Sequence, residues 1–323
     1  MANKIIKLAY LGLPLLAVSC SKSVVDDVEN PVETKIVRLS LTEEQTTVTE
    51  EPLLRAPALA KGNDEGRVYA VNVYSKAAGA KSYTKYAYGL FDDPSKMSIA
   101  LQTGSTYRFE CSETRDDQES VYHDADGYWA PFRHGGVPTP LENQFVHSST
   151  HNFEYLVEGS RQGWVSISAT DSTRCPRIYR YYALVDDFDP SQSETIDVEL
   201  RRAVFGLHLI IEPPTDGSVS LNYLTRNLTI SAGDAVYDHE AVYSYNQISR
   251  ACAEGYSGDY TFELVWMRAD GTKVEKSTTV TLKRNVMTTL HIRLEGRTPS
   301  GFQLSEEETE MGSESKDWVV KED

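Results

Sequence analysis

Histidines and carboxylates gather in the middle of this chain, and metal binding is the first chemistry that they suggest. The run HDADG at residues 123–127 has two carboxylates and a glycine, as calcium loops do. It lacks the regular carboxylate spacing and closing glutamate of an EF-hand, so an Asp-Gly turn explains it better. His147 and His151, with His134 nearby, are four residues apart, a spacing that brings two histidines to one metal ion on a helix, but the surroundings predict strands. We expect neither a metal nor another cofactor.

A second candidate site is an aromatic loop. Tyr128, Trp129, Phe132 and Arg133 lie among prolines and glycines, where exposed rings can stack on a sugar or on a protein partner. The alternative is that Trp129 and Phe132 close the end of a β-sandwich. The sequence has no nucleophile elbow, phosphate-binding glycine loop or HExxH motif, so we expect that the protein is not an enzyme.

The cysteines supply neither a zinc site nor a disulfide framework. Beyond Cys20 the chain has Cys111, Cys175 and Cys252, so at most one intramolecular disulfide can form among these three. Their spacing matches no zinc pattern. We expect buried or half-exposed thiols.

The N-terminal segment has the pattern of an export signal. Lys4 and Lys7 precede an apolar run over residues 8–18, which is too short to span a bilayer. The run ends in LLAVSC, which resembles the lipobox of bacterial lipoproteins. That resemblance implies removal of residues 1–19, a diacylglycerol on the Cys20 sulfur and acylation, as with palmitate, of its new amino group. An ordinary signal peptide, with Cys20 as a bystander, is the alternative.

Charge and composition limit the class of partner. Without residues 1–19 the chain has 30 basic and 48 acidic residues, a surface that repels nucleic acid. Residues 20–35 are polar and acidic, as expected of a tether. We therefore expect an extracytoplasmic domain that is held at the outer membrane by lipid on Cys20.

The remaining pattern predicts an all-β fold. In KIVRLSL, at residues 35–41, Val37, Leu39 and Leu41 share one face, as in a strand with one buried side. Similar short segments recur along the chain, and Ala269-Asp270-Gly271 between two of them predicts a hairpin turn.

The segments divide into two predicted β-sandwich domains, at residues 36–200 and 201–323. The first contains an irregular excursion at about residues 112–152, which is rich in Asp, His, Gly and Pro. Strands are expected to resume at residues 153–159 and 163–170.

Several of these features together resemble the fimbrillin family, the subunits of type V pili of Bacteroidetes-type bacteria. The lipobox precedes KIVRLSLTEEQTTV, EPLLRAPAL and RVYAVNVYSKAAG, as in the N-terminal region of that family. IDVELRRAVFGLHLII is similar to its crossover strand, TVTLKRNVMTTLHIRLEG to its late strand pair, and DWVVKED to its C-terminal strand. The resemblance implies two tandem transthyretin-like β-sandwich domains and a pilus (fimbrium) subunit that contributes to cell adhesion.

The family also implies assembly by strand exchange. A trypsin-like protease cuts after an arginine in the loop that follows the first strand, and that strand is lost. A strand from another copy or a related subunit then fills the groove. The matching bond here is Arg55–Ala56 in PLLR-APAL. An ordinary surface-loop arginine is the alternative.

The C-terminus supplies the expected donor strand. Trp318, Val319 and Val320 follow an acidic stretch, but Lys321 and two acids end the apolar run early. Two alternatives therefore stay open. One is a minor, tip or anchor subunit that keeps its lipid, and the other is a surface glycan-binding lipoprotein with the Trp129 loop as its platform for a host or bacterial ligand.

Overall fold

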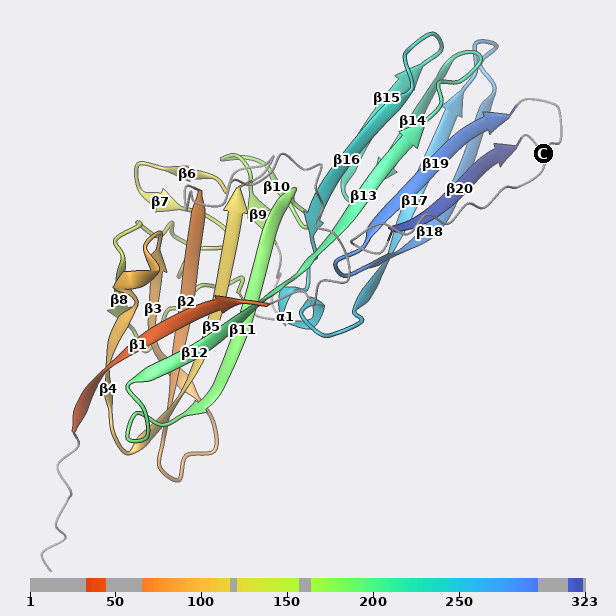
Figure 1. The fold of residues 1–323 in the computed structure, drawn as a ribbon. Coiled ribbons are helices and arrows are strands. Elements are labelled where there is room, and N and C mark those ends of the chain that lie inside the picture. Colours follow the sequence, from red (N-terminus) through yellow and green to blue (C-terminus); the bar gives the residue numbers. More distant parts are fainter. Residues whose placement is uncertain (1–32, 45–65, 117–120, 157–163, 296–312, 322–323) are drawn as a thin grey trace, which may run out of the picture. The chain divides into compact units, whose positions relative to one another are not determined.

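The computed structural model describes residues 33–44, 66–116, 121–156, 164–295 and 313–321 (Figure 1). Regular structure in these ranges is almost entirely β, which confirms the all-β prediction. The described non-β elements are a 3₁₀ turn, η1 (Pro94–Lys96), and one helical turn, α1 (Ile248–Ala251). In these ranges no helix is both long and apolar enough to span a membrane. The described residues between 33 and 321 belong to one unit.

The first half of this unit is an eight-stranded sheet that folds into two arms. One arm has the order β4-β1-β12 and the other β11-β5-β2-β3-β8. Two residue pairs join the arms, Tyr181 with Arg202 and Tyr182 with Arg201. The strands are β1 (Thr34–Glu43), β2 (Arg67–Ala77), β3 (Thr84–Phe91), β4 (Ser98–Gln102), β5 (Ser105–Asp116), β8 (Gln144–His147), β11 (Ile178–Phe188) and β12 (Thr195–Arg202).

The two arms enclose a shared apolar core, as expected of a sandwich. Alternating residues of β1 and β12 point into it from the short arm, and those of β2 and β5 from the long arm. Members of this core include Val37, Leu39, Ile196, Val198, Val71, Val73 and Phe109. The predicted face of the first strand is confirmed, because Val37 and Leu39 are buried and Leu41 packs against the core, whereas Ile36 is 59% exposed.

The other face of the long arm is covered by the irregular middle segment. Phe132, Phe153 and Leu156 pack there against Ala70 and Leu90. Two short strand pairs lie within this covering: β6 (His123–Asp124) with β7 (Gly127–Tyr128), and β9 (Val165–Ser166) with β10 (Ser172–Thr173). As a result β2 is buried on both faces.

Three sequence-based boundaries in this segment change. The strand β5 continues to Asp116, because its residues pair on one side with β2 and on the other with β11. The prediction of a strand at residues 153–159 is wrong over the described part of this range. There Phe153 makes one isolated bridge, and a turn follows. At residues 163–170 the described strand is the short β9.

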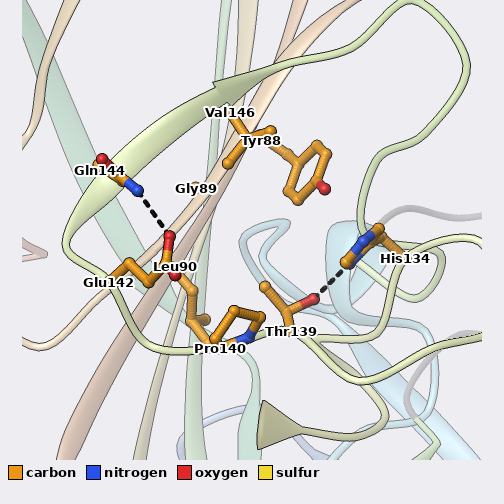
Figure 2. Close-up of a pocket in the computed structure, with 9 residues that line it drawn as sticks. All are labelled: Tyr88, Gly89, Leu90, His134, Thr139, Pro140, Glu142, Gln144 and Val146. Carbon is orange, nitrogen blue, oxygen red and sulfur yellow. Dashed lines mark hydrogen bonds between the residues drawn. The ribbon is translucent and has the colours of Figure 1, made fainter. Parts of the chain in front are cut away.

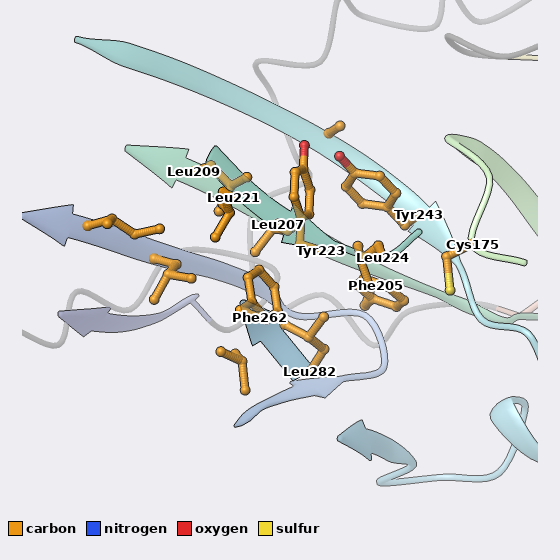
Figure 3. Packing of buried hydrophobic residues seen from close by; sticks show 14 of the residues in the cluster. Cys175, Phe205, Leu207, Leu209, Leu221, Tyr223, Leu224, Tyr243, Phe262 and Leu282 are labelled. Atoms are coloured by element: carbon orange, nitrogen blue, oxygen red, sulfur yellow. The ribbon is translucent and has the colours of Figure 1, made fainter. Parts of the chain in front are cut away.

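The second half has two four-stranded sheets. Their orders are β16-β13-β19-β20 and β15-β14-β17-β18. The strands are β13 (Val204–Ile211), β14 (Ser218–Tyr223), β15 (Arg226–Ser231), β16 (Tyr237–Ser244), β17 (Ser257–Met267), β18 (Lys273–Lys283), β19 (Met287–Glu295) and β20 (Ser313–Lys321). Side chains from both sheets form one core, with Phe205, Leu207 and Leu209 facing Leu221, Phe262 and Leu282 (Figure 3). β12 belongs to the eight-stranded sheet, whereas β13 belongs to a sheet of the second half. The chain therefore changes sheet between these two strands, close to the predicted division near Leu200.

Candidate functional site

The strand β1 lies inside its sheet, although it is the first strand of the described chain (Figure 1). It pairs antiparallel with β4 through its first half and parallel with β12 through its second half. Arg38 N–H donates to the Glu194 carbonyl at 2.9 Å, and Leu39 N–H donates to the Met97 carbonyl at 3.0 Å. Removal of β1 would leave backbone groups of both neighbours unpaired, which is the condition for another strand to add.

The inward face of β1 supplies part of the apolar core. Val37 is fully buried and Leu39 is 7% exposed. Burying a side chain of this size contributes about 1.5–3 kcal/mol. Loss of β1 would therefore open an apolar groove between β4 and β12, as well as two unpaired strand edges.

Arginines clamp the C-terminal end of β1. Arg67 Nη1 donates to Glu43 Oε1 at 3.1 Å, and Arg115 also contacts the Glu43 carboxylate. Arg115 lies over the Tyr181 ring at 4.5 Å and donates through Nε to buried Glu113 at 2.5 Å. Burial alone would lower the pKa of Arg115, but Tyr181 and the two carboxylates outweigh burial, so this pKa is raised.

Glu44, the residue directly after β1, is held by a third arginine. Arg284, in the turn between β18 and β19, pairs with Glu44 and donates through Nε to the Arg202 carbonyl at 2.7 Å. Its side chain is only 8% exposed. Glu44 N–H donates to the Leu200 carbonyl at 2.8 Å, so the backbone at the end of β1 is fixed as well. We call Arg67, Arg115 and Arg284 the arginine clamp.

The proposed cleavage and lipidation sites lie outside the described residues. Cys20 precedes residue 33, and Arg55 and Ala56 fall between Glu44 and Gly66. Lipidation, protease processing and membrane attachment stay predictions.

The predicted donor residues belong to β20. This strand pairs in parallel with β19 at the edge of its sheet, from Ser313 opposite Met287 to Lys321 opposite Glu295. Trp318 packs partly against the second core, and Lys316 Nζ donates to the Thr281 carbonyl at 3.4 Å. The backbone of Val319 and Val320 is described, but their side chains are not. In this structure the segment is therefore docked on its own chain.

The structure does not assemble the aromatic loop into one platform. Phe132 is fully buried in the core beneath the loop, so its ring is not available to a ligand. Tyr128 stacks on His123 at 4.7 Å, and Trp129 Nε1 donates to Asp124 at 2.8 Å. Arg133 donates to Glu154 at 2.9 Å and lies over Tyr155. The burial of Phe132 agrees with the alternative from the sequence, in which this ring packs inside the fold.

A pocket of about 210 Å³ lies beside this loop (Figure 2). Tyr88 of β3 and His134 form one wall, with ring centroids 4.7 Å apart, and His134 Nδ1 is 2.7 Å from the Thr139 hydroxyl. Polar groups at the opposite side are Glu142 and Gln144, whose Nε2 donates to the Glu142 carboxylate at 2.6 Å. Burial raises the pKa of Tyr88, and the Glu142 charge adds to this effect. The lining residues are Tyr88, Gly89, Leu90, His134, Thr139, Pro140, Glu142, Gln144 and Val146.

The described histidines do not gather around a metal position. His134 and His151 have ring centroids 6.1 Å apart, whereas His147 contacts the Tyr86 ring. Among the residues with described positions, no group of three or more His, Cys, Asp or Glu side chains could hold a metal ion. Cys111, Cys175 and Cys252 are free and buried.

Comparison with known proteins gives structural neighbours only. No protein-family profile matches the sequence, and no curated protein matches it. A candidate adhesin from Bacteroides ovatus is 11% identical, with 83% of this chain and 88% of that chain covered and a TM-score of 0.30. The fimbrial anchor protein Mfa2 from Porphyromonas gingivalis is 11% identical, with coverage of 76% and 82% and a TM-score of 0.29.

Another candidate adhesin from Bacteroides ovatus is 12% identical, with 78% of each chain covered and a TM-score of 0.31. These neighbours are adhesion and fimbrial proteins, the class that the sequence resemblance indicated. At these TM-scores they carry no functional argument, which must come from the contacts of this chain itself.

Proposed function

We propose that this protein is a non-enzymatic pilus subunit that is exported as a lipoprotein on Cys20 and assembles by donor-strand exchange. A trypsin-like protease cuts after Arg55, β1 leaves, and a strand of another subunit enters between β4 and β12. The pilus then carries the subunit to the cell surface, where it contributes to adhesion.

The observation that carries this proposal is the position of β1. It is the first described strand, yet it lies between two others and supplies Val37 and Leu39 to the core. A cut in residues 45–65 would separate β1 from the rest of the fold without breaking another described strand. The vacated site would have an apolar groove and unpaired strand edges. An extended segment that entered it would cover the apolar surface and form hydrogen bonds with both edges.

Limited trypsin treatment tests this proposal directly. We expect the large product to begin at Ala56 and to form a ladder of multimers on a denaturing gel run without boiling. Arg55→Ala should remain full-length and monomeric. Arg38→Ala is the matched control, because this exposed arginine lies within β1, and it should be processed like the wild type. Multimers whose subunits still begin at Cys20 would refute strand removal.

A lipid-retaining minor, tip or anchor subunit is the related alternative. It is favoured by the docking of β20 on its own chain, where the segment is already paired with β19. In that case the chain would accept a strand or stay at the membrane but would not donate one. N-terminal sequencing of protein from sheared pili and from outer membranes separates the two roles, since an anchor would begin at Cys20 in the membrane fraction.

The pocket beside β3 favours a second function, glycan binding. An aromatic wall at Tyr88 and His134 faces a carboxylate and an amide, a combination that suits a sugar ring. Binding to an array of bacterial and host glycans should be weakened by Glu142→Gln and by Gln144→Ala. Gln102→Ala, at the exposed end of β4, is the control. Absence of glycan binding by the wild type would reject this function.

A further inference from the structure

The arginine clamp contacts two adjacent acids at the end of β1, Glu43 in the strand and Glu44 directly after it. Arg67 and Arg115 contact both Glu43 and Glu113, and Arg284 contacts Glu44. When β1 is absent, Glu113 alone remains of these three acids. Arg115 and Arg284 would then each have lost one carboxylate partner, Glu43 and Glu44 respectively.

Arg115 and Arg284 lie in poorly hydrated places. The Arg284 side chain is 8% exposed even when the Glu44 carboxylate is bound. Arg284 also donates a hydrogen bond to a neutral carbonyl, that of Arg202. Arg115 is 15% exposed and would share the single carboxylate of Glu113 with Arg67. Partly buried cations favour a new acidic partner, because charge-assisted hydrogen bonds are stronger than neutral ones.

We propose that the arginine clamp selects the incoming strand by two adjacent acids and thereby sets its direction and register. The occupant is the C-terminal segment of a second copy of this chain, in which Glu322 and Asp323 follow the apolar run. This inference rests on the proposed strand exchange. It adds a specificity determinant, because an apolar groove alone would accept many alternating strands.

Matching the acids fixes the rest of the strand. If Glu322 takes the place of Glu43 and Asp323 that of Glu44, Val320 falls at the site of Leu41 and Trp318 at that of Leu39. The donor then runs parallel to β12, as β1 does. Lys316 falls at the site of Val37, so the apolar contacts of the donor are confined to Trp318 and Val320.

Peptide binding to the trimmed subunit tests the clamp. The full chain is cut with trypsin, the Ala56 terminus is verified, and fluorescein-labelled peptides are titrated by anisotropy below the concentration at which ladders form. The donor peptide covers residues 313–323. Glu322→Gln and Asp323→Asn should each weaken its binding by about tenfold, and the double change by about 100-fold, in line with lost charge-assisted bonds.

The matched control removes two acids elsewhere in the same peptide. Glu314→Gln with Asp317→Asn makes the same change in net charge, and it should alter affinity by less than about threefold, because these acids lie away from the clamp. A second control is the peptide of residues 33–45, in which Glu43→Gln with Glu44→Gln should mimic the double change in the donor. Arg284→Gln in the subunit should abolish the effect of Asp323→Asn while leaving that of Glu322→Gln.

The outcomes distinguish failure of the clamp from failure of strand exchange. If the donor peptide binds and its acids do not matter, the clamp is refuted while strand exchange stands. If only the peptide of residues 33–45 binds, the clamp acts on β1 and the assignment of the second copy as donor is overturned. If neither peptide binds a subunit shown to begin at Ala56, the proposed strand exchange itself fails.

Discussion

Leu39→Ala should destabilise the precursor but leave the trimmed subunit unchanged. Leu39 is 7% exposed and packs in the core between the two arms of the first sheet. Truncation of a buried leucine to alanine costs about 2–5 kcal/mol, and the cost depends on how far the surrounding residues collapse. Ile36→Ala changes the same strand at a side chain that is 59% exposed, and should cost less than about 0.5 kcal/mol.

Urea unfolding, followed by tryptophan fluorescence, measures both variants. The first unfolding transition of the intact Leu39→Ala precursor should occur at a lower urea concentration than that of the wild type or of Ile36→Ala. After trypsin cutting at Arg55 and loss of β1, all three proteins have the same sequence and should unfold identically. A trimmed variant that still differed from the wild type would show that β1 had been retained. An intact Leu39→Ala protein as stable as Ile36→Ala would refute the role of β1 in the core.

Three further predictions concern the anchor, the thiols and the last strand. Cys20→Ala should move the protein from the membrane fraction to the soluble fraction, and unchanged fractionation would exclude lipid on Cys20 as the anchor. Burial raises the pKa of the Cys175 and Cys252 thiols to about 12, so at pH 8 both should stay protonated and resist iodoacetamide until urea is added; rapid labelling of the folded protein would contradict this. Deletion of residues 313–323 should lower stability by no more than about 3 kcal/mol, the contribution of one large buried side chain, and should abolish ladders after trypsin. Collapse of the second sandwich would instead make β20 an integral strand.

Local periodicity predicted the strands that have one clear inner face. In β1 the alternation of Val37, Leu39 and Leu41 identifies the buried side, because successive side chains of a strand point in opposite directions. The turn at Ala269-Asp270-Gly271 is confirmed between β17 and β18, where Gly271 has a φ of 87° that glycine adopts readily.

The irregular middle segment could not be predicted in the same way. Phe153 and Leu156 suggested a strand, but they are buried as parts of a loop that covers the long arm. This loop is held by Asn72, whose side-chain amide exchanges hydrogen bonds with the Phe153 backbone at 2.9 and 3.1 Å. A buried asparagine in the middle of an apolar strand was the signal, but its partner lies 81 residues away. Local patterns carry no information about such a distant pairing.

The arginine clamp was hidden for the same reason. Glu44 and Arg284 are 240 residues apart in the sequence, and nothing local marks either as half of a pair. By contrast, the candidate exchange strand was visible from the alternation and from the position of Arg55. The sequence therefore indicated which strand could be replaced, while the tertiary structure indicates which charges a replacement would need.

Parallel pairing explains why the terminal strands are the ones suited to exchange. A parallel neighbour cannot be reached through a tight hairpin, so β1 and β12 are joined through the whole first sandwich, and β19 and β20 through residues 296–312. An inner hairpin strand is fixed by turns at both ends, and its removal would need two cuts. One cut after Arg55 would release β1, and β20 needs none, because it lies at an edge with one described strand neighbour, β19. The groove left by β1 and the segment that could fill it thus lie where exchange requires the least disruption of the remaining fold.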